Sequence, residues 1–384
     1  MKIVYSTESV NRNGGIHTVT IVKANALAEI EGNEVYIIVP HFHGDTPRKI
    51  SPKVHLVNLD MKNFWVPVFK QPARNREYKK RLQEVLETIG PDVVVSTGQQ
   101  DRNFLPAIRI SSNPVFIREI HFMSSYRRLM ADGSRKERLL ALWSEFLDYR
   151  LSIHKYDRIM LLSEEDRRIN WSGNPKAACI PNPLTVSSSA RSSLTAKKAI
   201  AVGRLCFQKH FDALIKAWKF VADKYPDWTL EIWGGNGSLY KNLHQLILDL
   251  NLSDHVLLKG ETPDISAKMA ESSFIVCTSV FEGMPLVLLE ALSAGLPIVT
   301  FNYKYGAEEI VKEGVNGFIV QEDDLDALSG RIGQLISDAE LRRKMGQNSS
   351  EYSQRFLPEI IAQRWMTLFL DLRQEKPNPK LIKE

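Results

Sequence analysis

The sequence predicts an α/β protein made of two doubly wound parallel sheets. Short apolar runs of strand length alternate with segments of helical period along most of the chain, which is the pattern of successive βαβ units. The chain has 384 residues, of which 43% are hydrophobic, and this length exceeds what one hydrophobic core usually holds. The alternation stops once, at a serine-rich stretch, and then restarts. We therefore expect two α/β domains of similar size.

The first domain is expected to span residues 1–185. It begins with a strand at 2–5, a loop through 11–15 and a helix from about 18 to 31. Further apolar runs predict strands at 35–39, 54–59, 92–96, 115–117, 159–162 and 177–180, with a segment rich in helix formers at 134–152.

The second domain is expected to span residues 195–360, after a polar linker. The stretch TVSSSARSSLTAKK, residues 185–198, has no apolar period and is typical of a linker. The last part of the chain, from about 360 to 384, is assigned to the first domain, because Trp365 and Phe369 of a helix at 351–373 can pack back onto it, together with Leu368. Strands are expected at 199–202, 229–233, 256–259, 274–278, 298–301 and 318–320, and helices at 211–225, 238–250, 263–270 and 285–294.

The composition argues against several classes of protein. Residues 1–190 carry 27 Lys and Arg against 20 Asp and Glu, a charge of +7, whereas residues 191–384 carry −2. The cations are not interleaved with aromatic residues in a nucleic-acid-binding motif, so no nucleic acid partner is expected. The three cysteines lack metal-ligand spacing. No apolar run approaches the ~20 residues of a membrane span, and no basic-then-apolar leader is present, so we expect a cytoplasmic protein.

In open parallel sheets, ligands bind beyond the carboxyl ends of the strands. Two such sheets are expected to face each other across a cleft whose walls are the strand-to-helix loops. Candidate functional residues are therefore sought in those loops.

The strongest candidate is the segment FEGMPLVLLEALSAGLPIV, residues 281–299. Glu282 ends the loop after a predicted strand, and Glu290 lies eight positions later. Eight helical positions are a little over two turns, so both carboxylates can share one face. A helix that begins near Pro285 offers unpaired amides to an anion such as a diphosphate, and carboxylates beside it can accept hydrogen bonds from hydroxyls. A surface helix with two solvated glutamates fits the same pattern.

The second candidate is the loop GRLCFQKH, residues 203–210, directly after a predicted strand. Arg204 and Lys209 could clamp phosphates there, Arg with a fork of donors and Lys as a point charge. No cluster of carboxylates or histidines suits Mg²⁺ or Mn²⁺, so we expect no metal and no other cofactor, with these two cations stabilising a leaving diphosphate. Two exposed bases in a loop are the plainer alternative.

Glycines and one histidine complete the candidates. Gly14 and Gly15 open a helix after the first strand, where backbone can approach a phosphate, although a tight turn fits equally well. Neither GxGxxG nor GxxxxGK[ST] occurs, which argues against a dinucleotide enzyme and a P-loop protein. Gly234, in WGGNGS, is more simply part of a strand-to-helix turn. His121 follows the strand at 115–117 and is well placed for the cleft, although lone histidines are more often structural.

Together these motifs resemble the retaining glycosyltransferases of family 4, which have the GT-B fold of two Rossmann-like domains. The most specific element is the Glu-seven residues-Glu motif, here Glu282 to Glu290. The NGG loop at 13–15, the GR-then-K loop, the glycine turn after EIW, and YGAEEIVKEGVNGFIV at 305–320 follow the family's order. The resemblance covers nearly the whole second half of the chain and, more loosely, the first half.

For the second half, the resemblance implies that Glu282 binds the hydroxyls of a donor sugar and Glu290 the ribose diol. Arg204 and Lys209 would hold the diphosphate of a nucleotide-sugar donor. The backbone amides that help them belong to Leu286 and Val287.

For the rest of the donor site, the resemblance implies that Gly15, with Gly14 beside it, faces the phosphates and that His121 lies near the transferred sugar. The backbone around Lys259, near the Gly234 turn, would meet the nucleobase. The family's reaction retains the anomeric configuration, and the leaving phosphate takes the acceptor's proton, so no protein general base is required.

The chain departs from the family pattern at two places. Many members have glycine where Pro285 stands here, and proline where Gly306-Ala307-Glu308 stands. Variants with EGMP and YGAEEIV resemble transferases that build bacterial surface polysaccharides, commonly from UDP-sugars. The alternatives are a nucleotide-sugar epimerase, a glycogen-type phosphorylase, and a non-catalytic sugar-nucleotide-binding scaffold.

A stretch in the first half predicts peripheral contact with a membrane. Residues 63–81 place Trp65 and Phe69 among several cations, and YRR at 126–128 adds more. Such a mixture can bind anionic lipid, which would suit a saccharide or lipid-linked acceptor held by the first domain. A solvated face with buried aromatics is the alternative. The cations expected to carry the contact are Arg74, Arg76, Lys79 and Lys80.

Overall fold

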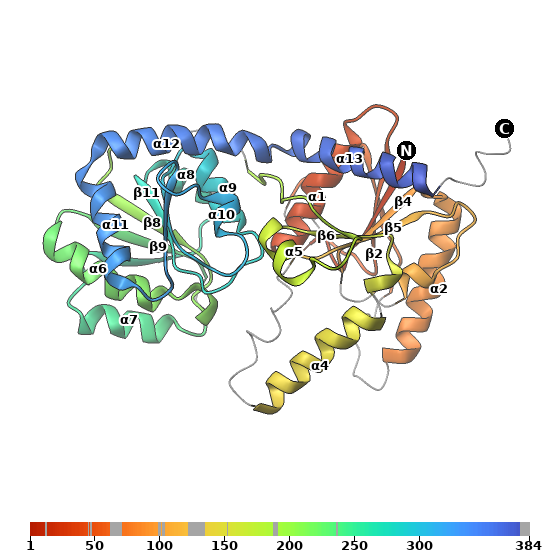
Figure 1. Cartoon of the computed structure of the whole chain (residues 1–384), viewed down its shortest axis with the longest axis horizontal. Helices are drawn as coiled ribbons and strands as arrows, with labels where there is room; N and C mark the ends of the chain where they lie inside the picture. Colours follow the sequence, from red (N-terminus) through yellow and green to blue (C-terminus); the bar gives the residue numbers. More distant parts are fainter. Residues whose placement is uncertain are drawn as a thin grey trace. The chain divides into compact units, whose positions relative to one another are not determined.

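The computed structural model describes residues 1–11, 14–44, 46, 48–61, 71–98, 101, 104–121, 135–151, 153–186, 191–235 and 237–376 (Figure 1). The chain divides into two compact units. Unit 1 consists of Met1–Pro183 and Pro358–Glu384, and unit 2 of Leu184–Leu357. Each unit contains one parallel sheet with helices packed against it, so the predicted fold class is confirmed.

The sheet of unit 1 has seven strands in the order β3-β2-β1-β4-β5-β6-β7, and all neighbours are parallel. The strand order reverses between β1 and β4. The strands are β1 (Lys2–Ser6), β2 (Glu34–Val39), β3 (Val54–Asn58), β4 (Val93–Ser96), β5 (Val115–Glu119), β6 (Arg158–Leu161) and β7 (Ala177–Cys179). The helices are α1 (Gly15–Ala28), α2 (Gln71–Ile89), α4 (Arg135–Leu151), α5 (Glu164–Asn170) and α13 (Pro358–Glu375), with short 3₁₀ turns η2 (Leu105–Ala107) and η3 (Ile153–Lys155).

Side chains of this sheet alternate between two cores, one on each face. Ile3 and Tyr5 of β1 pack in a cluster with α1 and α13, whereas Val4 between them packs in a cluster with α2. Trp365 and Phe369 of α13 are fully buried in the first of these cores. The end of the described chain is thereby held against its first strand.

The sheet of unit 2 has six parallel strands in the order β10-β9-β8-β11-β12-β13, which reverses between β8 and β11. The strands are β8 (Lys198–Val202), β9 (Thr229–Trp233), β10 (Val256–Gly260), β11 (Phe274–Cys277), β12 (Ile298–Phe301) and β13 (Gly317–Val320). The helices are α6 (Phe211–Lys224), α7 (Tyr240–Asp249), α8 (Ile265–Ala270), α9 (Leu286–Ser293), α10 (Ala307–Ile310), α11 (Leu325–Ser337) and α12 (Ala339–Ser353), and the 3₁₀ turns are η4 (Phe207–Lys209) and η5 (Gln354–Phe356).

Every strand expected from the sequence is present, but the sequence prediction lacks α2, α5, α10, α11 and α12. Helix α2 is the instructive case, because charged residues dominate it and its apolar stripe is narrow. Tyr78, Leu82 and Leu86 are spaced four residues apart and are its fully buried positions. Within the described ranges, no helix combines the length and the apolar character that a membrane span requires.

Candidate active site

Two loops of unit 2 meet where its strand order reverses. Strands β8 and β11 are neighbours in the sheet, and the chain leaves their carboxyl ends into the loops 203–210 and 278–285. Ligands of open parallel sheets bind at such a switch point. The first loop carries Arg204 and Lys209, and the second carries Glu282.

Lys209 and Glu282 form an ion pair across these loops. Lys209 Nζ donates a hydrogen bond to Glu282 Oε1 over 2.6 Å, and the two side chains are 15% and 10% exposed. Burial lowers the pKa of Lys209, but the Glu282 carboxylate and the nearby Cys277 outweigh it, so that the pKa is raised. Lys209 is therefore a cation at neutral pH. Because an ammonium group has three N–H donors, it can bind an anion while it remains bonded to Glu282.

Three hydrogen bonds hold the two loops together and thereby fix this pair. The Gln208 side-chain amide donates to the carbonyl of Phe281 (2.9 Å), and the Val280 N–H donates to the carbonyl of Gln208 (3.0 Å). The Thr278 hydroxyl donates to the carbonyl of Lys209 (2.9 Å). Gln208 and Thr278 are absent from the sequence prediction. Only the adjacency of β8 and β11 gives them this role, and no sequence motif marks it.

The glycines after β8 and β9 are required by close packing of backbone. A Cβ on Gly234 would lie 1.8 Å from the carbonyl oxygen of Gly203, and one on Gly237 would lie 2.2 Å from that of Leu205. The Gly234 N–H donates to the carbonyl of Gly260 (2.8 Å), so this amide is already occupied. Gly203 itself leaves room for Lys209, whose Cε would lie 2.7 Å from an added Cβ. The turn that contains Gly234 therefore supports the Lys209 loop.

Helix α9 begins within one residue of the predicted start. Its first residue is Leu286, with Pro285 as N-cap, so Glu282 lies in the loop before the helix. The expectation that Glu282 and Glu290 share a helical face is therefore wrong, because the four residues from Glu282 to Pro285 are not helical. No side chain caps α9 and its first turn has no acidic residue. Within the described ranges, the amides of Leu286 and Val287 have no acceptor, as expected of an open anion site.

Glu290 lies one turn into α9 and is half-buried. Its Oε1 accepts a hydrogen bond from the Thr185 hydroxyl over 2.6 Å. Thr185 is buried, although the sequence prediction places it at the start of a linker. This hydrogen bond holds one carboxylate oxygen of Glu290 in place and thereby fixes the orientation of the carboxylate group.

The other two predicted cations of unit 2 are exposed. Within the described part of the chain, the side chain of Arg204 has no hydrogen-bond or ion-pair partner, so its guanidinium fork is available to a ligand. Lys259 is at the end of β10, and its Nζ lies 5.7 Å from the centroid of the Trp233 ring. That contact is a cation–π interaction between neighbouring strands.

In unit 1, the predicted glycines lie at the N-terminus of α1. Gly14 is the N-cap and has extended backbone angles that any residue can adopt (φ −168°, ψ 145°), so a tight turn does not explain it. No side chain caps the helix, and its first turn has no acidic residue. The amides of Gly15 and Ile16 therefore lie at an uncapped helix N-terminus, where an anion can bind. A Cβ on Gly14 would lie 3.4 Å from the His17 ring, an ordinary contact.

His121 belongs to a buried charged cluster that the sequence analysis does not predict. Lys23 of α1 and Glu119 at the end of β5 form a hydrogen-bonded ion pair, and their side chains are 1% and 2% exposed. The Lys23 ammonium lies 5.5 Å from the centroid of the Tyr5 ring and 4.9 Å from that of Trp365. His121 Nε2 lies 3.6 Å from Glu119 Oε1, too far for a hydrogen bond. No sequence pattern predicts this ion pair, because Lys23 lies within the apolar stripe of a helix and Glu119 at the end of a strand.

His121 is neutral at physiological pH. Its side chain is 4% exposed, and burial lowers its pKa from 6.5 to about 4. Glu119 opposes this shift, whereas Lys23, Arg118 and His17 add to it. Within the described residues, Nε2 of His121 and Oε2 of Glu119 have no hydrogen-bond partner. A neutral imidazole has one donor and one acceptor, so His121 can bind a hydroxyl group without carrying charge.

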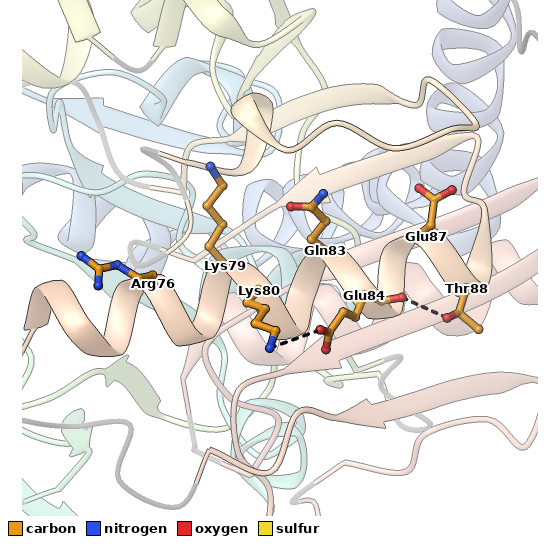
Figure 2. Close-up of a pocket in the computed structure, with 7 residues that line it drawn as sticks. All are labelled: Arg76, Lys79, Lys80, Gln83, Glu84, Glu87 and Thr88. Atoms are coloured by element: carbon orange, nitrogen blue, oxygen red, sulfur yellow. Dashed lines mark hydrogen bonds and ion pairs between the residues drawn. The ribbon is translucent and has the colours of Figure 1, made fainter.

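The remaining geometry offers no second centre of chemistry. In the described ranges, no group of three or more His, Cys, Asp or Glu side chains is arranged to hold a metal ion. A surface hollow of about 790 Å³ lies along α2, at neither switch point. Figure 2 shows that its walls are charged and polar side chains of that single helix: Arg76, Lys79, Lys80, Gln83, Glu84, Glu87 and Thr88. The hollow follows the side of one helix and not the carboxyl ends of the strands, where ligands of open parallel sheets bind.

Two family models match the chain. The model "Glycosyl transferases group 1" matches residues 187–352, and the model "Glycosyltransferase Family 4" matches residues 13–187. The chain is a family 4-like glycosyltransferase with the GT-B fold. The first model covers the loops that carry Lys209 and Glu282, and the second covers His121.

Relatives of this glycosyltransferase extend over most of its length. An uncharacterized glycosyltransferase of Haemophilus influenzae is 28% identical over 372 residues, which cover 95% of this chain and 98% of the relative. Exopolysaccharide phosphotransferase SCO2592 of Streptomyces coelicolor is 30% identical over 310 residues, 79% of this chain but 31% of that protein. The structure of Anabaena Alr3699/HepE in complex with UDP and glucose shares the fold, with a TM-score of 0.72 and 20% identity over 96% of this chain and 99% of that one.

The buried pair Lys23–Glu119 should be essential for stability. Lys23→Met leaves Glu119 buried and without its partner, and should lower the free energy of unfolding by about 3–5 kcal/mol in urea titrations. The double variant Lys23→Met/Glu119→Gln should recover much of the loss, because no uncompensated charge remains. The control is Lys53→Met, which breaks the exposed Lys53–Glu29 pair (2.6 Å) and should cost under about 1 kcal/mol. Equal losses for Lys23→Met and Lys53→Met would contradict the assignment.

The lowered pKa of His121 predicts a pH-dependent stability. The unfolded chain binds a proton at His121 near pH 6.5 and the folded chain only near pH 4, so stability is complete above pH 6.5 and falls as the pH drops toward 4. His121 should contribute a loss of about 2 kcal/mol between pH 7 and pH 5. Urea unfolding of the wild type and of His121→Gln at both pH values measures it. An unchanged slope in His121→Gln would show that other groups cause the dependence.

Proposed function

We propose that this glycosyltransferase moves a sugar from a nucleotide-sugar donor, most simply a UDP-sugar, to a saccharide or lipid-linked saccharide, with retention of configuration and without a metal ion. The observation that carries the proposal is the Lys209–Glu282 pair at the switch point of the unit 2 sheet. It places a cation and a hydroxyl-binding carboxylate side by side. A nucleotide-sugar has a diphosphate and a hydroxyl-bearing ring in the same proximity.

In this proposal the diphosphate binds to Lys209, Arg204 and the open N-terminus of α9. Lys209 is cationic and has donors to spare, and the Arg204 side chain is exposed. The α9 amides add the positive end of a helix dipole. These groups stabilise the negative charge that develops on the leaving diphosphate, which is the role that a metal ion has in other transferases. HepE, a structural neighbour, binds UDP and glucose.

The two glutamates have separate roles. Glu282 accepts hydrogen bonds from hydroxyls of the donor sugar, and Glu290 accepts them from the ribose diol. Their separation supports this division, because Glu282 precedes α9 and Glu290 lies one turn inside it. Gly14, Gly15 and His121 belong to unit 1, and their roles toward the donor remain those that the family resemblance implies.

Transfer with retention requires no general base from the protein. The bond between the anomeric carbon and the diphosphate oxygen breaks, and the acceptor oxygen bonds to the same face of that carbon. The acceptor's proton passes to the leaving diphosphate oxygen. Lys209 and Arg204 balance the charge of that oxygen during the step, so the protein's contribution is electrostatic.

The acceptor side is proposed more broadly. A relative is named as an exopolysaccharide phosphotransferase, although this chain spans 31% of it. A role in assembling surface polysaccharide at the cytoplasmic face of the membrane accords with that name and with the basic first half of the chain. Product analysis by mass spectrometry, with a panel of UDP- and GDP-sugars and a cell-envelope lipid extract, tests it. UDP binding without turnover of any sugar donor would favour a non-catalytic scaffold, and a product isomerised at one carbon would favour an epimerase.

Substitution of each glutamate should separate binding from turnover. Glu290→Ala should weaken UDP binding by about 10- to 100-fold, because hydrogen bonds to a charged group contribute about 1.5–3 kcal/mol. Glu282→Ala should keep or improve UDP affinity, since it frees Lys209 for the diphosphate, but should lower kcat by about 100-fold or more. Calorimetry with UDP and initial-rate kinetics give both values. Equal loss of UDP affinity in the two variants would refute the assigned roles.

Turnover should not depend on a divalent metal. Treatment with EDTA should leave the rate nearly unchanged, because Lys209 and Arg204 neutralise the leaving group. Lys209→Ala should lower kcat by about 100-fold or more, in the range seen when one donor to a developing anion is removed. A requirement of the EDTA-treated wild type for added Mg²⁺ or Mn²⁺ would refute metal independence.

A further inference from the structure

Helix α4 exposes a set of large apolar side chains. Leu139 is 63% exposed and Trp143 60%, and Leu140, Leu142 and Phe146 are also exposed. The Trp143 and Phe146 rings stack on each other with centroids 5.8 Å apart. Large exposed apolar patches are rare on monomeric proteins, and they mark surfaces that bind a partner or a membrane.

These side chains form one stripe. Residues 139, 142, 143 and 146 have the i, i+3, i+4, i+7 spacing of a single helical face. Among the described elements, α4 packs chiefly against the short turn η3 that follows it. In Figure 1, α4 stands away from the sheet of unit 1. The stripe is therefore not covered by the core of the unit.

Exposed cations lie on α4 itself and on α2, another helix of the same unit. Arg135 and Arg138 lie in the first turn of α4 and are exposed. On α2, Arg76, Lys79 and Lys80 line one end of the flank that Figure 2 shows. Glu84 and Glu87 line the rest of it, and Glu84 Oε1 lies 3.9 Å from Lys80 Nζ. The sequence prediction also assigns Arg74 to this basic surface. That assignment is wrong, because Arg74 is buried and its guanidinium donates a hydrogen bond to Asn75. The other predicted contacts, Trp65, Phe69 and YRR at 126–128, lie outside the described residues.

We propose that α4 is the element by which this protein binds the surface of an anionic lipid bilayer, with its apolar stripe in the headgroup boundary and the cations of α4 and α2 on the lipid phosphates. Charge decides between occupants. In the first turn of α4, two exposed arginines stand against one exposed glutamate, Glu137. A second copy of the helix would bring these arginines toward each other, whereas an anionic bilayer complements them and accepts Trp and Phe at its boundary. The inference deepens the proposed function, because it names the membrane as the partner at which the acceptor is met.

Vesicle co-sedimentation tests the proposal with the full-length protein. The probes are vesicles of phosphatidylglycerol and phosphatidylcholine in equal parts, and of phosphatidylcholine alone. The wild type should bind the anionic vesicles at least about tenfold more strongly, and binding should weaken as salt rises, since screening shortens to ~8 Å near physiological ionic strength. Leu139→Ser/Trp143→Ser should lower binding by about tenfold or more. Arg76→Gln/Lys79→Gln/Lys80→Gln should lower binding and its salt dependence.

The matched control is Phe220→Ser/Leu248→Ser, which removes two exposed apolar side chains from unit 2 and should change binding less than about twofold. Hydrogen exchange on the wild type provides a readout that needs no variant, because amides of 135–151 should gain protection when anionic vesicles are added. UDP affinity should be equal in all variants, so failure of the nucleotide-sugar proposal and failure of this one are distinguishable.

Three results would overturn the inference. The first is absence of vesicle binding by the wild type at low salt. The second is binding that the α4 variant retains, or protection that appears elsewhere than in 135–151. The third is a concentration-dependent dimer, seen by light scattering, that the α4 variant abolishes in the absence of vesicle binding, which would make the stripe an interface between two copies.

Discussion

The reversal of strand order in each sheet is the constraint on which the candidate site depends. Parallel strands release the chain at one edge, and only at the reversal do neighbouring loops turn to opposite faces. In unit 2 this happens between β8 and β11, which brings Lys209 and Glu282 together although 73 positions separate them in the chain. In unit 1 the loop with Gly14 and Gly15 leaves β1 at the corresponding reversal. The chemistry is thus positioned by topology, and the helices supply open N-termini beside it.

The Lys23–Glu119 pair of unit 1 and the Lys209–Glu282 pair of unit 2 differ in what their surroundings permit. Lys23 and Glu119 are both fully buried, and the Lys23 ammonium lies over the Tyr5 and Trp365 rings. Separating this pair would leave each charge unpaired and away from water, at a large desolvation cost. Lys209 and Glu282 keep some exposure and lie in loops. The first pair is suited to fix a core beside His121, and the second to open for a ligand. Identical residue types therefore serve unlike purposes because burial differs.

The fold was predictable from the sequence because buried parallel strands are near-continuous apolar runs, and all of them were identifiable. Helix α2 was not, since its stripe of Tyr78, Leu82 and Leu86 is narrow among many charges. Of the site, the loops after β8 and β11 could be located by motif. The start of α9 was also predicted to within one residue, because proline is favoured in the first turn of a helix. What could not be predicted is the direction of Glu282, because its side chain is positioned by a loop and not by the helix. Residues such as Gln208, Thr185 and Lys23 act through tertiary contacts that leave no periodic signal. Arg74 was wrongly assigned to the basic surface for a similar reason, because charge alone does not show which cations are buried.

The Lys209–Glu282 pair also bears on how an empty site treats the many small anions and sugars of a cell. The Glu282 carboxylate partly neutralises Lys209, so an anion is attracted less strongly than by a lone ammonium even though N–H donors remain for it. A free sugar must compete with that ammonium for the carboxylate. A molecule that carries an anion and vicinal hydroxyls on one short frame can satisfy both partners at once and repay the separation of the pair. In the proposed donor site, the pair therefore favours ligands that bring an anionic group and hydroxyls together over ligands that carry only one of the two.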